Sequence, residues 1–147
     1  MKRNVLFLVH VEEAFRHLFP DKLYIHRLLK AIQAKRYDEV ICLESQIDTN
    51  FELIQEIKNL TFMPRVINWG WGYEAEMFEG KEKAWVIPTD SCHQTTWVPP
   101  ELRKMQRNLQ QAKVFVGGGG ENECLQDFMD VLAYLNVPAK KVGGYIF

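Results

Sequence analysis

The sequence predicts an α/β fold, a three-layer sandwich in which a mostly parallel, Rossmann-like sheet of about five strands carries helices on both faces. Short apolar runs without alternation, such as residues 5–9 and 114–116, are typical of strands buried on both sides. Segments with apolar residues at spacings of three and four lie between these runs, as expected of amphipathic helices. Alternating strands and helices form β-α-β units, whose right-handed crossovers place helices on both faces of the sheet.

The first half of the chain holds two strong strand signals and one weaker one. The predicted strands are Val5–Val9, Val40–Leu43 and the short Arg65–Asn68. A helix is predicted between the first two strands, with Asp21 as its cap and an end near Lys35. A second helix is predicted from the apolar face that Leu53, Ile54, Ile57 and Leu60 form.

The second half continues the same alternation. Strands are predicted at Trp85–Ile87, Val114–Val116 and Val142–Phe147. The last one contains two glycines, which favours an edge position. Pro99-Pro100 opens a predicted helix that reaches Ala112, because proline is well tolerated in the first turn. Four glycines at 117–120 end one strand and lead into another helix, whose apolar face runs from Leu125 to Leu135.

Composition indicates one soluble domain over residues 1–147. The 18 basic and 19 acidic residues give a net charge of −1, so no basic field favours nucleic acid, and a small-molecule ligand is expected instead. The three cysteines lack zinc or redox spacing, which favours a reducing compartment such as the cytoplasm and predicts no cofactor. The apolar run at residues 5–9 is too short to span a membrane.

Ligands of open parallel sheets bind at the carboxyl ends of the strands, which predicts where the site lies. The polar side chains that follow the predicted strands are His10, Glu12, Glu13, Glu44, Gln46, Asp48, Thr89, Asp90, Ser91, Cys92, His93, Glu121, Asn122, Glu123 and Cys124. Cys124 stands near the start of a helix, where the helix dipole favours a thiolate, although a small buried cysteine fits the same position. The turn at Gly118, Gly119 and Gly120 can offer backbone N–H groups to an anion, or can serve only as a tight turn.

Three short segments resemble the isochorismatase-like cysteine hydrolases. They are Leu8–Phe15, Val40–Asp48 and Val116–Leu125. The resemblance implies a doubly wound α/β sheet and a Cys-Asp-Lys triad that hydrolyses amides or related bonds of small molecules. It makes Cys124 the nucleophile, while the aspartate of the family falls on His10 and its glutamine on Glu12. No lysine lies between residues 85 and 97, and the nearest ones are Lys81 and Lys83.

Our first functional hypothesis is therefore a small-molecule hydrolase with an altered triad. Cys124 attacks the substrate, and His10 takes the thiol proton, since histidine can activate a thiol. Glu12 or Asp90 orients His10, and the N–H groups of the glycine turn stabilise the oxyanion.

Two other hypotheses stay open. In a metal-dependent hydrolase acting on phosphoesters, carboxylates and an imidazole would hold the ion; the ligands would be Glu12, Glu44, Asp90, His93 and Glu121. In a non-catalytic binding or assembly module, Trp69 and Trp71 would contact a ligand or partner. The edge strand at residues 142–147 could then pair with a second copy of the chain, giving a homo-oligomer.

Overall fold

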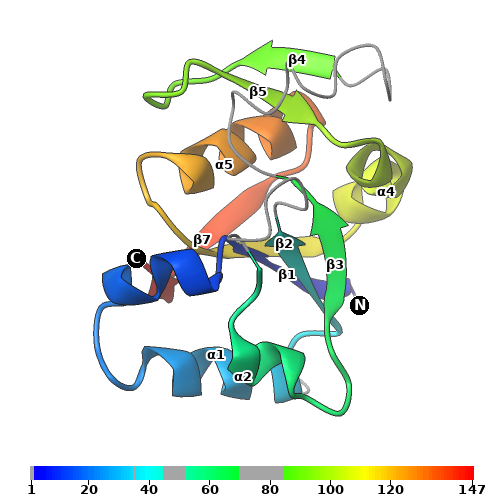
Figure 1. The fold of residues 1–147 in the computed structure, drawn as a ribbon. Helices are drawn as coiled ribbons and strands as arrows, with labels where there is room; N and C mark the ends of the chain where they lie inside the picture. The colour runs from blue at the N-terminus through cyan, green and yellow to red at the C-terminus, as the bar shows by residue number, and fades with distance from the viewer. Residues whose placement is uncertain (1, 35, 45–51, 70–84) are drawn as a thin grey trace.

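A five-stranded parallel sheet forms the centre of the protein (Figure 1). The computed structural model describes residues 2–34, 36–44, 52–69 and 85–147. The sheet strands are β1 (Asn4–Val9), β2 (Glu39–Glu44), β3 (Arg65–Asn68), β6 (Lys113–Gly118) and β7 (Ala139–Ile146). Their order is β3-β2-β1-β6-β7, and every pairing between neighbours is parallel. The predicted fold class and the edge position of the last strand are thus confirmed.

Helices cover both faces of this sheet, and the sheet separates two apolar cores. The 3-10 helix η1 (Glu13–Leu18), α1 (Tyr24–Gln33) and α2 (Gln55–Lys58) belong to one side, while α4 (Pro100–Gln110) and α5 (Cys124–Tyr134) belong to the other. Leu6 and Leu8 of β1 enter the core under α1, whereas Phe7 and Val9 enter the core under α5. Because both faces are covered, residues 5–9 of β1 are all apolar, as the unbroken run predicted. No helix in the described ranges has the length and apolarity needed to cross a membrane.

The predicted helix at residues 53–60 is shorter than expected, because its first residues take part in a β-bridge. Leu53 bridges with Glu12 in the antiparallel sense, and the N–H of Ile54 donates to the carbonyl of Val11 at 3.1 Å. These contacts hold the backbone extended, so α2 begins only at Gln55. They also fix the segment that follows β1 at the carboxyl edge of the sheet.

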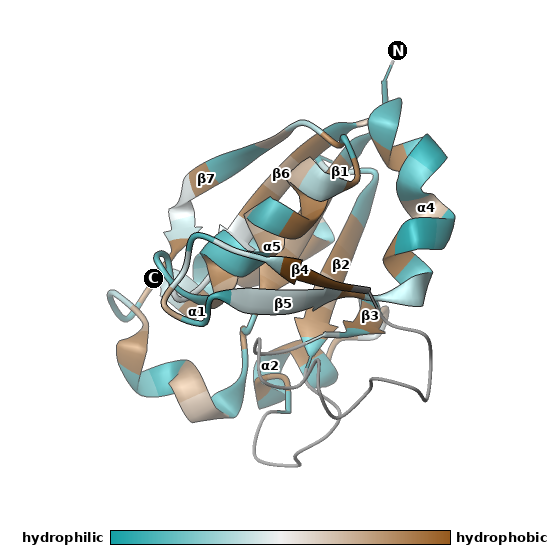
Figure 2. Ribbon diagram, turned by 90° about the horizontal axis from the view of Figure 1, so that it is seen from above, coloured by the Kyte–Doolittle hydropathy of each residue, from teal (hydrophilic) through white to brown (hydrophobic). Residues whose placement is uncertain are grey.

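The strand predicted at Trp85–Ile87 exists, but it does not join the parallel sheet. It is β4 (Trp85–Pro88), which pairs in the antiparallel sense with an unpredicted strand, β5 (Thr95–Val98), as a separate two-stranded sheet. The hairpin lies across α5, as the two ribbon views show (Figures 1 and 2). Burial of Trp97 and Val98 in the core beneath α5 and α4 holds it there. The loop between β4 and β5 is therefore carried over α5 rather than along the sheet edge.

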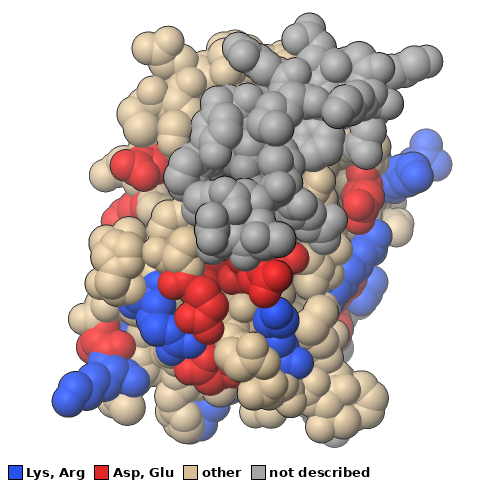
Figure 3. Space-filling model, viewed as in Figure 1, with Lys and Arg blue, Asp and Glu red and all other residues tan. Residues whose placement is uncertain are grey.

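Charged side chains of both signs alternate over the described part of the face in Figure 3. A group of ion pairs joins η1 to α2. The guanidinium of Arg16 contacts the carboxylates of Glu13 at 2.8 Å and Glu56 at 2.6 Å. The hydrogen bond from Arg16, with a second from the backbone of Gln55, lowers the pKa of Glu13 to about 2.

This carboxylate gives a prediction about acid stability. A lowered folded-state pKa means that Glu13 stabilises the fold fully above about pH 4.5, its value without these contacts, and that this contribution is lost as the pH falls through about 2. We expect Glu13→Gln to be less stable than the parent in urea unfolding at pH 7, with the difference narrowing between pH 4.5 and 3. In an Arg16→Gln background the same substitution should have a smaller effect. A pH-independent difference would contradict the prediction.

Candidate active site

The β4–β5 turn is held on α5 by hydrogen bonds from three of its residues. The backbone N–H of Asp90 donates to the carboxylate of Asp130 at 2.9 Å, and the hydroxyl of Ser91 donates to Asp127. His93 also contacts Asp127. Gln94 takes a positive φ of 65° and closes the turn through its carbonyl, which accepts from the N–H of Thr89 at 2.8 Å. The sequence of this turn therefore fixes where the imidazole of His93 lies.

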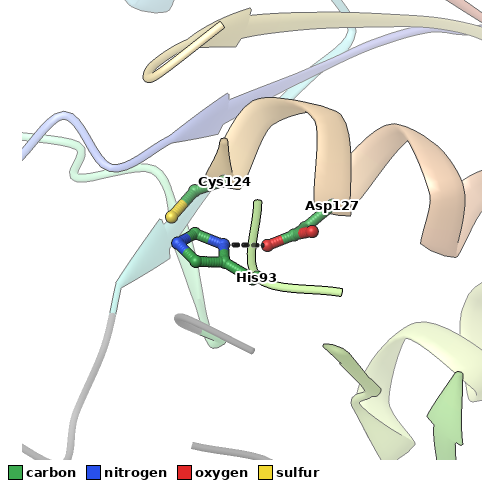
Figure 4. A group of neighbouring side chains, drawn as sticks. All are labelled: His93, Cys124 and Asp127. Atoms are coloured by element: carbon green, nitrogen blue, oxygen red, sulfur yellow. Dashed lines mark hydrogen bonds and ion pairs between the residues drawn. The ribbon is translucent and has the colours of Figure 1, made fainter. Parts of the chain in front are cut away.

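His93, Cys124 and Asp127 form a compact cluster at the start of α5 (Figure 4). One nitrogen of His93, the Sγ of Cys124 and a carboxylate oxygen of Asp127 all lie within 4.8 Å of one another. Cys124 is the first residue of α5, and Asp127 follows three residues later, so both side chains share one helix face. Cys124 and Asp127 are buried, whereas His93 is partly exposed.

The cluster is ordered as a thiol, an imidazole and a carboxylate. Nδ1 of His93 lies 2.5 Å from Oδ2 of Asp127, and Figure 4 shows the other ring nitrogen facing Sγ of Cys124. An ionised carboxylate only accepts hydrogen bonds, so beside it a neutral imidazole carries its hydrogen on Nδ1 and has Nε2 as the acceptor. Asp127 is fully buried, and Ser91 donates to its second oxygen, so both oxygens of the buried charge are satisfied. This arrangement leaves the Nε2 of His93 able to take the proton of the Cys124 thiol.

The same three residues are the only described group of His, Cys, Asp and Glu placed to share a metal ion. Two ligands on a tetrahedral zinc lie about 3.3–3.7 Å apart, given bond lengths of about 2.0–2.3 Å. The 2.5 Å between His93 and Asp127 is a hydrogen-bonding distance instead. The geometry therefore favours an oriented histidine over a pair of metal ligands.

Of the predicted metal ligands, His93 alone belongs to this cluster, so the predicted set is not assembled. Glu44, at the end of β2, accepts the N–H of Leu53 at 2.7 Å. Asp90 and Glu121 are exposed. Asp90 lies on the turn between β4 and β5, because β4 pairs with β5 and is not part of the main sheet. Glu12 is bonded to His10 instead.

His10 and Glu12 form a second, fully buried pair at the end of β1. Nδ1 of His10 is hydrogen-bonded to Oε1 of Glu12, one of the two residues predicted to orient it. Asp90, the other residue predicted for that role, is on the hairpin turn over α5. His10 does not belong to the cluster around Cys124; the nearby imidazole in that cluster is His93. The partner of the thiol is thus a different histidine from the one that the sequence suggested.

The glycine turn is used chiefly for close packing. A Cβ on Gly118 would lie 2.5 Å from the backbone nitrogen of Val9 and closer still to its carbonyl oxygen, and one on Gly119 would enter the ring of Phe147. The N–H of Gly119 is taken by the carbonyl of Val9 at 2.9 Å. At Gly120 a Cβ would meet only Glu123, at 3.6 Å or more. Of the three predicted anion-binding glycines, Gly120 is the one that close packing does not explain.

The predicted aromatic contact surface is not formed by Trp69. This side chain is fully buried in the core, and its Nε1 donates to the carbonyl of Trp97 at 3.0 Å. Its ring meets Phe128 of α5 edge-on at 5.4 Å. Apolar packing, rather than ligand stacking, accounts for its position. Trp71, Lys81 and Lys83 lie outside the described residues.

Asp127 is the residue of the cluster that sequence reasoning missed. It lies between Cys124 and Phe128 on the helix face that also carries Val131, and all four are buried. A carboxylate within an apolar face must have a buried partner, so this interruption of the pattern was a usable signal. The side chain that supplies the partner could not be found in the same way, because it comes from a distant turn.

No protein-family model and no curated protein matches this chain. Among solved structures, it is similar to a protein of Leishmania major for which a MAR1 ribonuclease function has been proposed, with a TM-score of 0.60 at 14% identity. The similarity covers 99% of this chain and 65% of that protein, so the chain spans about two thirds of its length. At this level of identity the similarity shows the shared Rossmann-like α/β fold.

Proposed function

We propose that this chain is a cysteine hydrolase that cleaves amide or related bonds of small molecules, with Cys124 as nucleophile and His93 as general base. The observation that carries the proposal is the cluster in which His93 stands between the Cys124 thiol and the buried Asp127 carboxylate. A nucleophile, a base and a group that orients the base are the parts that covalent hydrolysis needs. The resemblance of residues 116–125 to the nucleophile turn of isochorismatase-like hydrolases also supports Cys124 in this role.

The steps follow from the order of the three side chains. Nε2 of His93 takes the thiol proton, and Sγ of Cys124 attacks the substrate carbonyl carbon, so an S–C bond forms and the carbonyl electrons move to oxygen. Collapse of this intermediate breaks the C–N bond, and His93 returns the proton to the leaving nitrogen. Water, deprotonated by His93, then attacks the thioester and releases the acid. Cys124 leaves as the thiol and the enzyme is restored.

Two features of the helix start assist these steps. The positive end of the α5 dipole favours a thiolate at its first residue. Backbone N–H groups at this end are the donors closest in sequence to the nucleophile, and Gly120 is the glycine of the turn that has room beside it. The N–H groups of Glu121, Glu123 and Leu125 already donate to backbone carbonyls. We therefore assign the oxyanion to the N–H groups of Gly120 and Asn122, which would stabilise the negative oxygen of the intermediate.

Alkylation of Cys124 by iodoacetamide tests the proposal directly. The other two cysteines can be controlled, because burial raises the pKa of the Cys42 thiol to about 12 and the exposed Cys92 can be replaced by serine. In the Cys92→Ser protein we expect mass spectrometry to find rapid modification of Cys124 at pH 7, where an ordinary thiol, titrating near ~8.5, is mostly protonated. The Cys92→Ser/Cys124→Ser protein is the control and should stay unlabelled.

The result also separates the other functions. An unreactive Cys124 would contradict the cysteine hydrolase. Calorimetric titration with zinc, manganese and magnesium distinguishes the metal-dependent alternative, for which binding should disappear in Cys124→Ser and Asp127→Asn. We expect no such binding, since the carboxylate of Asp127 is already bonded to His93 and Ser91.

A further inference from the structure

His10 and Glu12 form a buried polar pair that has no role in the proposed reaction. His10 is 1% exposed and Glu12 is 0% exposed. Nδ1 of His10 is bonded to Glu12, while Nε2 is buried and has no hydrogen-bond partner among the described residues. Buried polar atoms are almost always paired, so an orphaned imidazole nitrogen calls for a physical reason.

The ring of His10 is packed by two aromatic side chains and bonded at one of its two nitrogens. Trp69 stacks against the ring at 6.1 Å between centroids, and Phe15 packs at a tilt at 5.4 Å. Glu12 holds the Nδ1 side. The protein thus supplies two ring contacts and a bond to Nδ1, and Nε2 is the remaining polar position of the ring.

The backbone at His10 is also strained. Its φ is +54°, in the left-handed region that side chains with a Cβ rarely adopt. A non-glycine residue in this conformation persists only where its surroundings hold it, and such residues gather at ligand sites. The strain turns the chain directly after β1, so that His10 and Glu12 can meet two residues apart.

The pair lies at the same edge of the sheet as the cluster around Cys124. Val9, the last residue of β1, is in register with Gly118, and its carbonyl accepts the N–H of Gly119 in the turn that leads to α5. Trp69, stacked on His10, meets Phe128 one turn along α5 from Cys124. The ligand edge predicted for a parallel sheet thus holds two histidine–carboxylate pairs. One faces the thiol, and the other has a buried nitrogen without a hydrogen-bond partner among the described residues.

We infer that His10 and Glu12 form a substrate-binding pair, in which Nε2 of His10 hydrogen-bonds a polar group of an amide ligand held at this edge. The inference rests on the proposed function for the class of ligand and adds a positioning residue to it. Glu12 fixes the ring orientation and tautomer, in the way that Asp127 does for His93. The two histidines then have different roles: His93 transfers the proton, and His10 binds the ligand.

The test uses benzamide as the probe and the Cys124→Ser protein, which cannot react with it. The chain has four histidines, so their ring nitrogens can be followed by long-range ¹H–¹⁵N NMR. We expect benzamide to shift Nε2 of His10 in a saturable way and to leave the exposed His17 and His26 unchanged. In the Cys124→Ser background, His10→Leu should weaken benzamide binding at least tenfold, whereas His10→Gln, which keeps a polar group, should weaken it less.

Kinetic measurements distinguish this role from a purely structural one or from a general base. With Cys124 intact, His10→Gln should raise the KM for hydrolysis of p-nitrophenyl acetate and leave the alkylation of Cys124 by iodoacetamide within about twofold. Loss of alkylation in a folded His10→Gln protein would make His10 the base and overturn the inference, as would the absence of any benzamide shift. Unreactive Cys124 together with a saturable His10 shift would contradict the proposed hydrolase and retain the ligand site.

Discussion

Replacing His93 by glutamine should lower the rate of p-nitrophenyl acetate hydrolysis by about 10²–10⁴-fold, the usual contribution of a general base. Glutamine can still bond to Asp127, but it cannot take the proton of Cys124. The alkylation of Cys124 at pH 7 should fall with it, because the thiolate loses the imidazole that faces it. Both rates are measured in the Cys92→Ser background, with circular dichroism to confirm that the variant folds.

Two further variants make the result specific to the cluster. Asp127→Asn should also reduce hydrolysis, since an amide can offer an N–H to Nδ1 and so stabilise the wrong tautomer of His93. His26→Gln removes an exposed imidazole of α1 and should change nothing. Full hydrolytic activity in His93→Gln would refute His93 as the general base. If His10→Gln lost that activity instead, His10 would be the base.

Replacing Gly118 by alanine should destabilise the fold by about 3–5 kcal/mol, the range of a strained backbone combined with a core clash. Gly118 has a φ of +99°, and a Cβ there would run into the backbone of Val9 on the neighbouring strand. The atoms that this Cβ would meet belong to the backbone and cannot rotate away as a side chain could, so β1 and β6 would have to separate. For a protein of this size the melting temperature should fall by roughly 10 °C or more.

Gly120→Ala is the matched control for this effect. A Cβ at Gly120 meets only the side chain of Glu123, at ordinary contact distance. Its free energy of unfolding should therefore stay within about 1 kcal/mol of the parent. Equal losses of unfolding free energy in the two alanine variants, measured in urea, would contradict the prediction. They would show that the close approach of Gly118 to Val9 is not the reason for glycine at position 118.

Much of the fold was predictable because buried parallel strands leave a clear sequence pattern. Val5–Val9 and Val40–Leu43 are apolar throughout, and the structure places both in the centre of the sheet with covered faces. The predicted helices are present, but their predicted ends differ from the observed ones. The first residues predicted for α2 are held extended by the bridge between Leu53 and Glu12, a contact between distant segments that local periodicity cannot reveal.

The hairpin was harder to predict, because its strands are short and their partners are not specified locally. Trp85–Ile87 resembles any other apolar strand, and only pairing with Thr95–Val98 removes it from the main sheet. This difference changes the site. It moves Asp90 away from the residues with which it was grouped and brings His93 onto the face of α5 that carries Cys124.

The sequence by itself determined the α/β fold class and the position of Cys124 near the start of a helix, because both follow from patterns of residues close together along the chain. It offered Glu12 as one of two residues that could orient His10, and the structure pairs His10 with Glu12. The tertiary structure alone decided which histidine meets the thiol. His93 reaches Cys124 and Asp127 because Trp97 and Val98 bury the hairpin against the helices, and burial between distant segments is set by packing.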